Sequence, residues 1–269
     1  MREGCSPGVA AGGTSPPSRT CSTGWGSGSR IAPIPADVAH RGGHEVLVGH
    51  RPVRLGRRGA LAVPGIDVSR YQGDIDWRQV RASGIDCAFI KATEGGDRID
   101  DYFDEHWSKT KAAGVPRAAY HFYYFCRPAA EQAAWYIKNV PNDRSAMPPV
   151  LDMEWNPDSP TCRKRPDPAT VRSEMKTFLS MVEKHYGKRP IIYTSVDFFD
   201  DNGLSSFRGY PYWLRSVAGH PDDKYARHPF TFWQYTGTGV VPGIRGNADI
   251  NVFNGNMAAW KKWLKANTG

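Results

Sequence analysis

Pro149-Val150-Leu151-Asp152-Met153-Glu154-Trp155 is an apolar stretch that carries two acidic residues two positions apart. An apolar run of this kind, bounded by Pro, predicts a buried strand. Because side chains at i and i+2 of a strand point to the same face, Asp152 and Glu154 project together, and Leu151 and Met153 point the other way. Two strand steps span roughly 6.6 Å, so the two carboxylates are neighbours.

Neighbouring carboxylates oppose each other's ionisation, which tends to hold a proton on one of them. A proton donor beside a carboxylate is the minimal equipment for cleaving a glycosidic bond. An isolated Asp-x-Glu is more often a strand end with two solvated acids. The functional interpretation therefore depends on the rest of the chain.

Apolar segments of strand length recur on both sides of this stretch. We expect the other strands at 61–69, 85–92, 116–125, 189–195, 210–217, 230–235 and 248–253. Helical periodicity with start and stop signals predicts helices at 76–81, 102–113, 128–140, 168–186 and 257–265. Eight strands with helices between them predict a single irregular (β/α)8-like barrel of the α/β class. Regular helices are expected mainly in the first half, because the later connections are short and rich in Gly and Pro.

The chain of 269 residues divides by composition near residue 60. Residues 1–59 are rich in Gly, Ser, Pro and Arg, so we expect a disordered extension there and one barrel domain at 60–269. The extension holds eight Arg, no Lys and three acidic residues, which accounts for +5 of the net charge of +8. The basic charge thus belongs mainly to the extension, and no nucleic-acid recognition motif accompanies it.

Several other classes of protein lack support in the sequence. No apolar run approaches the ~18 residues of a membrane span, and residues 1–59 show no signal-peptide core. The five Cys have no C-x-x-C spacing, which argues against a zinc site. We expect a monomer without a metal or cofactor, without stable membrane insertion and without a nucleic-acid partner.

Polar residues fall at several of the predicted strand ends. In barrels of this kind the carboxyl-terminal strand ends build the active face. Acids at four of eight ends are hard to explain by stability alone, since burying charge near charge costs free energy. The acids are Asp67, Glu94, Asp152 with Glu154, and Asp249; the other polar or aromatic residues are Tyr71, Lys91, His121, Tyr123, Tyr193, Trp213 and Gln234. Lys91 is a candidate counter-ion. The aromatics Tyr71, Tyr123, Tyr193 and Trp213 are candidates to stack on sugar rings, with core packing as the alternative for each.

The chain resembles the family 25 glycoside hydrolases, the Chalaropsis-type lysozymes. The matching pieces, in order along the chain, are 65–69, 71–73, 89–95, 119–122, 151–154, 192–194, 232–235 and 249–253. The resemblance implies an irregular barrel that hydrolyses the β-1,4 bond between N-acetylmuramic acid and N-acetylglucosamine in peptidoglycan. A secreted, periplasmic or cell-wall location follows from that substrate.

The resemblance also implies roles for individual residues. Glu154 matches the proton donor, and Asp152 matches its partner, which acts as nucleophile or assists the acetamido group of the substrate. Asp67 and Asp249 match further catalytic acids. The expected substrate-binding residues are Glu94, Lys91, Tyr71, His121, Tyr123, Tyr193, Trp213 and Gln234.

Two other functions compete with this interpretation. A chitinase-like glycosidase needs D-x-x-D-x-D-x-E, but Val150 and Met147 occupy the positions of two of those acids. A non-catalytic peptidoglycan-binding barrel should keep its aromatics and lose the donor acid, whereas Glu154 is present.

Cys126 and Cys162 each follow the end of a predicted strand, and the two strands are adjacent. We expect them to form a disulfide between two rim loops, with a pair of free thiols as the alternative. Cys87 lies in the middle of a predicted strand and should be a buried thiol.

Overall fold

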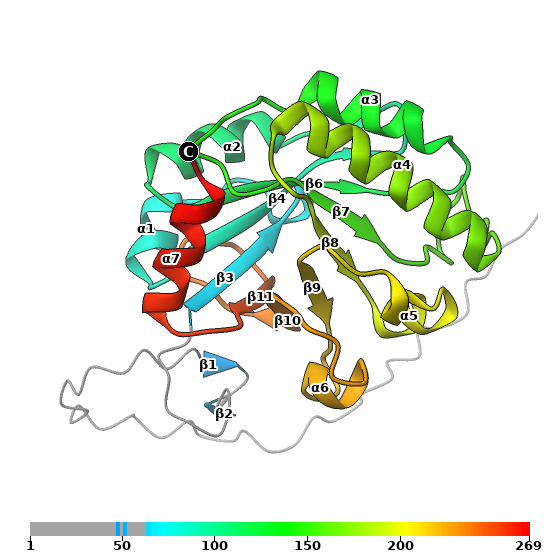
Figure 1. Ribbon diagram of the computed structural model, residues 1–269. Coiled ribbons are helices and arrows are strands. Elements are labelled where there is room, and N and C mark those ends of the chain that lie inside the picture. The colour runs from blue at the N-terminus through cyan, green and yellow to red at the C-terminus, as the bar shows by residue number, and fades with distance from the viewer. Residues whose placement is uncertain (1–46, 49–50, 53–62) are drawn as a thin grey trace, which may run out of the picture. The chain divides into compact units, whose positions relative to one another are not determined.

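The computed structural model describes residues 47–48, 51–52 and 63–269 (Figure 1). Within the predicted extension, β1 (Leu47–Val48) pairs antiparallel with β2 (Arg51–Pro52). The rest of that segment lies outside the described residues. The domain boundary near residue 60 also lies there and stays a prediction.

Eight strands close into a barrel. In chain order they are β3 (Val63–Val68), β4 (Cys87–Glu94), β6 (Arg117–Phe122), β7 (Val150–Met153), β8 (Ile191–Thr194), β9 (Tyr212–Arg215), β10 (Phe232–Gly239) and β11 (Ala248–Phe253). Their order around the barrel is β3-β11-β10-β9-β8-β7-β6-β4, and the pairing of β4 with β3 closes the ring. A short strand, β5 (Arg98–Ile99), pairs with the end of β4. The predicted single irregular barrel is confirmed.

One barrel strand runs against all the others. The pairings from β3 through β4, β6, β7, β8, β9 and β10 are parallel, whereas β11 is antiparallel to both β10 and β3. The start of β11, and not its end, therefore lies at the same rim as the carboxyl-terminal ends of the other strands. The expectation that Asp249 stands at a carboxyl-terminal strand end is wrong, because it is the second residue of β11.

Regular helices cover the first half of the barrel, as predicted. They are α1 (Trp77–Ala82), α2 (Phe103–Ala112), α3 (Ala129–Asn139) and α4 (Pro168–Tyr186), and Figure 1 shows α3 and α4 side by side. The second half has short elements that the sequence pattern did not reveal, namely α5 (Val196–Asp201), α6 (Pro221–Lys224) and the 3-10 turn η2 (Leu204–Ser206). A further 3-10 turn, η1 (Arg70–Gln72), follows β3, and α7 (Met257–Asn267) ends the chain.

The ends of α4 show how local sequence sets an element. The Asp167 side chain accepts hydrogen bonds from the backbone N–H groups of Ala169 and Thr170, and Pro168 occupies the first helical position. These groups satisfy donors that a helix start leaves unpaired. At the other end Gly187 adopts a φ of 66°, a left-handed conformation that glycine accepts without strain.

The barrel interior is filled by apolar side chains. Phe89 on β4 stacks on Trp213 on β9 with a centroid separation of 4.1 Å, although these strands are not neighbours in the sheet. Such a contact is possible only across the interior. Trp260 of α7 packs against Phe232 and Phe253 and covers the end of the barrel that lies opposite the rim with Asp249. A second apolar cluster fills the space between the strands and the outer helices.

A disulfide joins Cys126, in the loop after β6, to Cys162, in the loop after β7. The predicted pairing is therefore present, and Cys87 is a buried free thiol, as expected. The two half-cystines are 36 positions apart in the chain, so the bond closes a long loop. In the chain-entropy description a closure of this length restricts the unfolded state and stabilises the fold by ~3–4 kcal/mol.

We expect the double substitution Cys126→Ala/Cys162→Ala to lower the free energy of unfolding by ~3–4 kcal/mol, because the unfolded chain regains the closed-off conformations. Urea titration followed by tryptophan fluorescence measures this change. Reduction of the unsubstituted protein should have a similar effect, since Cys87, the other cysteine among the described residues, is a buried thiol that reduction does not alter. Equal unfolding midpoints for the variant and the oxidised protein would contradict the prediction.

Candidate active site

Strand β7 divides its side chains between the two faces of the barrel wall. Leu151 and Met153 belong to the cluster that packs under the outer helices, and Val150 belongs to the interior cluster. Asp152 alternates with them and is therefore directed to the interior, where only 7% of it is exposed. Glu154 follows β7 directly and continues this alternation to the rim. The predicted placement of both acids on one face is confirmed.

Two further acids meet Asp152 and Glu154 at the same rim. Asp67 of β3 and Asp249 of β11 stand directly opposite each other in the antiparallel register. Side chains of directly paired residues lie on the same face and close together, so these two carboxyl groups are neighbours. Each of the four acids lies close enough to at least two of the others to take part in a mutual effect on ionisation: Asp67 with Asp249, Glu154 and Asp152, and Glu154 with Asp152 and Asp249.

A buried hydrogen-bond network holds Asp67 from below. Its Oδ1 accepts hydrogen bonds from Gln234 Nε2 at 2.9 Å and from Asn251 Nδ2 at 2.8 Å. The Tyr193 hydroxyl donates to Gln234 Oε1 at 2.9 Å, and Trp213 Nε1 donates to Asn251 Oδ1 at 2.8 Å. Because these two donors occupy the amide oxygens, both amide nitrogens are directed at Asp67. Asn251 is a site residue that the sequence analysis quoted in a motif and did not assign.

The network explains why Tyr193 and Trp213 are at the site. Both are buried, with Trp213 2% exposed and stacked on Phe89, so neither presents a ring face to a sugar. Core packing, the alternative considered for each, describes their position. Tyr71, in contrast, is 76% exposed at the rim, where a sugar ring can reach it.

His121 and Tyr123 do not line the site, and their assignment as substrate-binding residues is wrong. His121 is fully buried between β6 and the helices, where its ring stacks on Phe178. Its two ring nitrogens form hydrogen bonds with the side chains of Thr93 and Gln132. The Tyr123 hydroxyl donates to Glu174 of α4 at 2.6 Å. Side chains alternate along this segment, and both residues occupy positions whose side chains point to the outer layer.

The side chains at the alternate positions of the same segment point into the barrel. Tyr120 belongs to the interior cluster, and the Tyr124 hydroxyl donates to Glu94 Oε1 at 2.6 Å. A shift of one residue along this aromatic segment therefore separates the interior of the barrel from its outer layer.

A bulge in β4 brings Lys91 and Glu94 to one face. The register with β6 shifts between Lys91 and Thr93, so residues three apart share a face. Lys91 Nζ lies 2.6 Å from Glu94 Oε2. Burial raises the pKa of Glu94, but Lys91 and the Tyr124 hydroxyl outweigh it and hold that pKa below its usual value. Glu94 is thus an ionised partner of Lys91, which makes it a poor proton donor.

Glu154 has the electrostatics of a proton donor. Burial raises its pKa to about 7, and the charges of Asp197 and Asp249 act in the same direction. Arg215 and Lys91 oppose the rise. A carboxyl group with this pKa keeps its proton near neutral pH, which general acid catalysis requires.

The other acids are also unusually easy to protonate. Burial raises the pKa of Asp152 well above its usual value, and the neighbouring Glu154 adds to the rise. Asp152 Oδ1 is buried and accepts no hydrogen bond from the described residues. Burial and the charge of Asp249 likewise raise the pKa of Asp67. Each of these carboxyl groups is therefore easier to protonate than a carboxyl group in water.

Arg215 is a site residue that the sequence analysis missed. It is the last residue of β9 and shares the inward parity of Trp213. Its charge lowers the pKa of Glu154 and of Asp249. The sequence did contain a signal for Arg215: it stands near the end of a predicted strand, two residues after the predicted site residue Trp213. Within the described part of the chain, no group of three His, Cys, Asp or Glu residues could hold a metal ion.

Residues 66–244 match the sequence profile of Glycosyl hydrolases family 25. The chain belongs to this family. It is 36% identical over 223 residues to YegX of Escherichia coli O6:H1, which covers 78% of this chain and 77% of YegX. It is 33% identical over 221 residues to Lysozyme M1 of Streptomyces globisporus, with coverage of 76% and 72%. The solved family 25 glycosyl hydrolase of Bacillus anthracis aligns with a TM-score of 0.67 at 36% identity, over 74% of this chain and 92% of that one.

These matches confirm the resemblance inferred from the sequence, and the chain is a glycoside hydrolase. No helix among the described residues has the length and apolar character needed to cross a membrane.

Arg215 should set the alkaline limit of activity in this family 25 hydrolase. Because its charge lowers the pKa of Glu154, Arg215→Met should raise that pKa and move the alkaline limb of the pH profile to higher pH. Arg215→Lys keeps the charge and should leave the limb in place. The pH dependence of kcat/KM on peptidoglycan measures both, and an unmoved limb in Arg215→Met would show that the arginine does not act on the donor.

The buried acids should reduce stability at neutral pH. The raised pKa of Asp152 disfavours the folded state increasingly as pH rises above the unfolded-state value of about 3.9. Asp152→Asn should therefore raise Tm at pH 7 by about 2 °C or more, which corresponds to roughly 1 kcal/mol in a domain of this size. The gain should vanish near pH 3, where the carboxyl group is protonated in both states.

Glu94→Gln is the matched control with the opposite sign. The lowered pKa of Glu94 stabilises the fold above the unfolded-state value of about 4.3, and this contribution disappears as pH falls through the folded-state value. The substitution should lower Tm at pH 7. Calorimetry at pH 3 and pH 7 separates the two variants, and a change of the same sign in both would refute the assignment.

Proposed function

We propose that this family 25 hydrolase is a muramidase, which cleaves the β-1,4 bond between N-acetylmuramic acid and N-acetylglucosamine in bacterial peptidoglycan. The observation that supports it most directly is the proton held on Glu154, whose pKa is raised to about 7, beside Asp152 on the same strand face. The name of the relative Lysozyme M1 points to the same activity.

In the proposed reaction Glu154 donates its proton to the glycosidic oxygen. The bond between that oxygen and the anomeric carbon breaks, and positive charge develops on the sugar ring. Asp152 stabilises this charge in its ionised form, either by bonding the anomeric carbon or by accepting the N–H of the substrate's acetamido group while the acetamido oxygen bonds that carbon. Glu154, now a carboxylate, then takes a proton from the water that completes hydrolysis.

The remaining groups have supporting roles in this proposal. Asp67 and Asp249 favour the protonated state of the cluster through their charges. Lys91 lowers the pKa of Asp152 and so favours the ionised form that stabilises the positive charge on the sugar ring. Gln234 and Asn251 hold Asp67 in position through their amide nitrogens.

The competing functions fit the site less well. Met147 and Val150 occupy the positions of the two additional acids of a chitinase-like site, and both are buried in the apolar interior of the barrel. A non-catalytic binding barrel has no need for four neighbouring acids, two of them buried, which oppose each other's ionisation and disfavour the folded state.

We also propose that the protein acts outside the cytoplasm, in the periplasm or at the cell wall, where its substrate lies. The disulfide between Cys126 and Cys162 supports this, because such bonds persist in oxidising compartments.

Substitution of the donor tests the mechanism. Glu154→Gln keeps the shape and removes the proton, so hydrolysis should fall at least about 10²-fold, the lower bound for a missing general acid. Asp152→Asn should also reduce turnover severely. Glu183→Gln, on the outer surface of α4 where Glu183 pairs with Arg189, is the control and should keep full activity.

Digestion of purified peptidoglycan followed by mass spectrometry tests the bond. Products with muramic acid at the reducing end are expected. Reducing-end N-acetylglucosamine would overturn the assignment of the bond. More than about a tenth of the activity in a folded Glu154→Gln variant would overturn the assignment of the donor.

A further inference from the structure

A pocket of about 840 Å³ opens next to the catalytic acids. Lys91 and Glu94 form its inner edge, and Lys91 is close enough to Asp152 and Glu154 to lower the pKa of both. The volume is in the range of sites that hold a whole small ligand. The pocket thus provides room beside the cleavage site for a group that is attached to the sugar undergoing cleavage.

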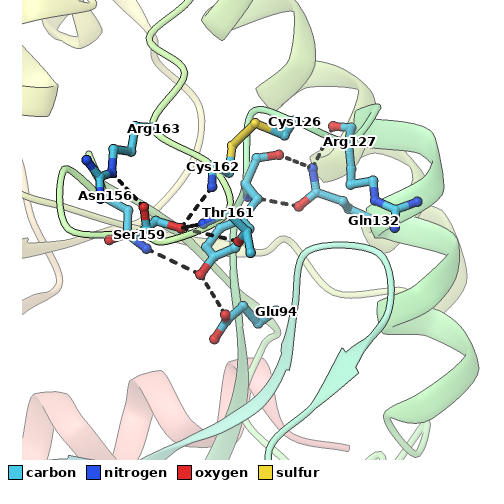
Figure 2. Close-up of a disulfide and its surroundings, with 10 residues drawn as sticks. Glu94, Cys126, Arg127, Gln132, Asn156, Ser159, Thr161, Cys162 and Arg163 are labelled. Carbon is cyan, nitrogen blue, oxygen red and sulfur yellow. Dashed lines mark hydrogen bonds between the residues drawn. A yellow bond between two sulfur atoms is a disulfide. The ribbon is translucent and has the colours of Figure 1, made fainter. Parts of the chain in front are cut away.

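A second wall of this pocket is the loop that the disulfide anchors. Figure 2 shows the disulfide and the residues of this loop. Within the loop, Ser159 Oγ accepts hydrogen bonds from the backbone N–H groups of Thr161 at 3.3 Å and Cys162 at 3.0 Å. Arg163 Nε donates to the Ser159 carbonyl at 2.7 Å. With both a covalent bond and these hydrogen bonds, the wall has a defined shape before any ligand binds.

The same wall connects to the catalytic face. Asn156 Nδ2 donates to the Tyr124 hydroxyl at 3.3 Å, and that hydroxyl donates to Glu94 at 2.6 Å. Glu94 in turn pairs with Lys91. A ligand in the pocket therefore sits against groups that are linked to the acids where the bond is cleaved.

The charges in the pocket leave cations available. Lys91 is paired with Glu94, and Arg127 is paired with Asp97 at 2.8 Å. Arg70 and Arg98 also line the pocket, and neither has a carboxylate within ion-pair distance among the described residues. Asp158 also lines the pocket, so four cationic side chains (Arg70, Lys91, Arg98 and Arg127) outnumber three carboxylates (Glu94, Asp97 and Asp158).

The pocket also offers apolar surface to a ligand. Phe122 and Tyr124 line it, and the exposed ring of Tyr71 lies at its edge. An occupant with both carboxylate and aliphatic groups matches this lining better than an uncharged sugar, because guanidinium groups bind carboxylates in two-pronged geometry.

We propose that this pocket binds the peptide stem of peptidoglycan, with Arg70 and Arg98 pairing a carboxylate of the stem. The proposal rests on the muramidase function proposed above. In the substrate, each muramic acid carries a lactyl group whose carboxyl carbon is joined to a short peptide with free carboxylates. A muramic acid held against Asp152 and Glu154 directs that substituent away from the glycan chain, and the pocket next to Lys91 receives it.

Three forms of one glycan test the proposal. The first keeps its stems, the second has been stripped by an amidase so that only the lactyl carboxylate remains, and the third carries stems whose carboxylates have been converted to amides. For the unsubstituted full chain, kcat/KM should be highest on the first form and should fall on both others. The difference should shrink at high ionic strength, since the pairing arginines are at least partly exposed to solvent.

The double variant Arg70→Gln/Arg98→Gln should reduce the ratio of kcat/KM on stemmed glycan to that on stripped glycan by about fivefold or more, as two partly exposed ion pairs allow. Arg78→Gln is the matched control, since Arg78 is exposed on α1 and lies outside the pocket. Its ratio should equal that of the unsubstituted protein.

The contrary outcomes are distinct. Equal kcat/KM on all three glycans would overturn the stem proposal and leave the muramidase function intact. Equal loss of the double variant on stemmed and stripped glycan would show that the pocket holds sugars. Full activity on the amidated stems would overturn the role of the carboxylate. Failure to cleave any of the three would overturn the muramidase function itself.

Discussion

The antiparallel pairing of β11 with β3 is the constraint on which the site depends. It joins the last strand of the chain to the first strand of the barrel, and its register sets Asp249 directly opposite Asp67. A parallel last strand would place Asp249, the second residue of β11, at the opposite end of the barrel, far from the other acids. The same strand supplies Asn251, which holds Asp67 from below. The reversed direction of this one strand thus brings Asp249 next to Asp67 and supplies the Asn251 side chain that hydrogen-bonds Asp67.

The fold tolerates a cluster of like charges because the surroundings are arranged for protonation. Burial disfavours the ionised forms, and the neighbouring acids reinforce the effect, so protons remain on the cluster near neutral pH. The positive charges of Lys91 on β4 and Arg215 on β9 limit this rise: both lower the pKa of Glu154, and Lys91 also lowers that of Asp152. The cost is a loss of stability at this rim, and the result is a Glu154 that keeps its proton near neutral pH.

The buried aromatic residues hold the polar groups of the site in position. Tyr193 and Trp213 occupy the oxygens of two amides, which leaves the amide nitrogens only one orientation, toward Asp67. The stacking of Trp213 on Phe89 joins this network to the apolar interior. The disulfide ties the loop after β7 to the loop after β6, so these two segments of the rim are anchored to each other.

The sequence by itself determined the eight strands, the outer helices and the shared face of Asp152 and Glu154, because hydrophobic period and i, i+2 alternation are local properties of the chain. It also placed Cys126 and Cys162 after adjacent strands. It could not determine which parity of an aromatic strand faces inward, which is why His121 and Tyr123 were assigned to the wrong side. Only the tertiary structure decided which positions face inward, the direction of β11 and the raised pKa of Glu154, since each depends on strands that are distant in sequence and meet only when the barrel closes.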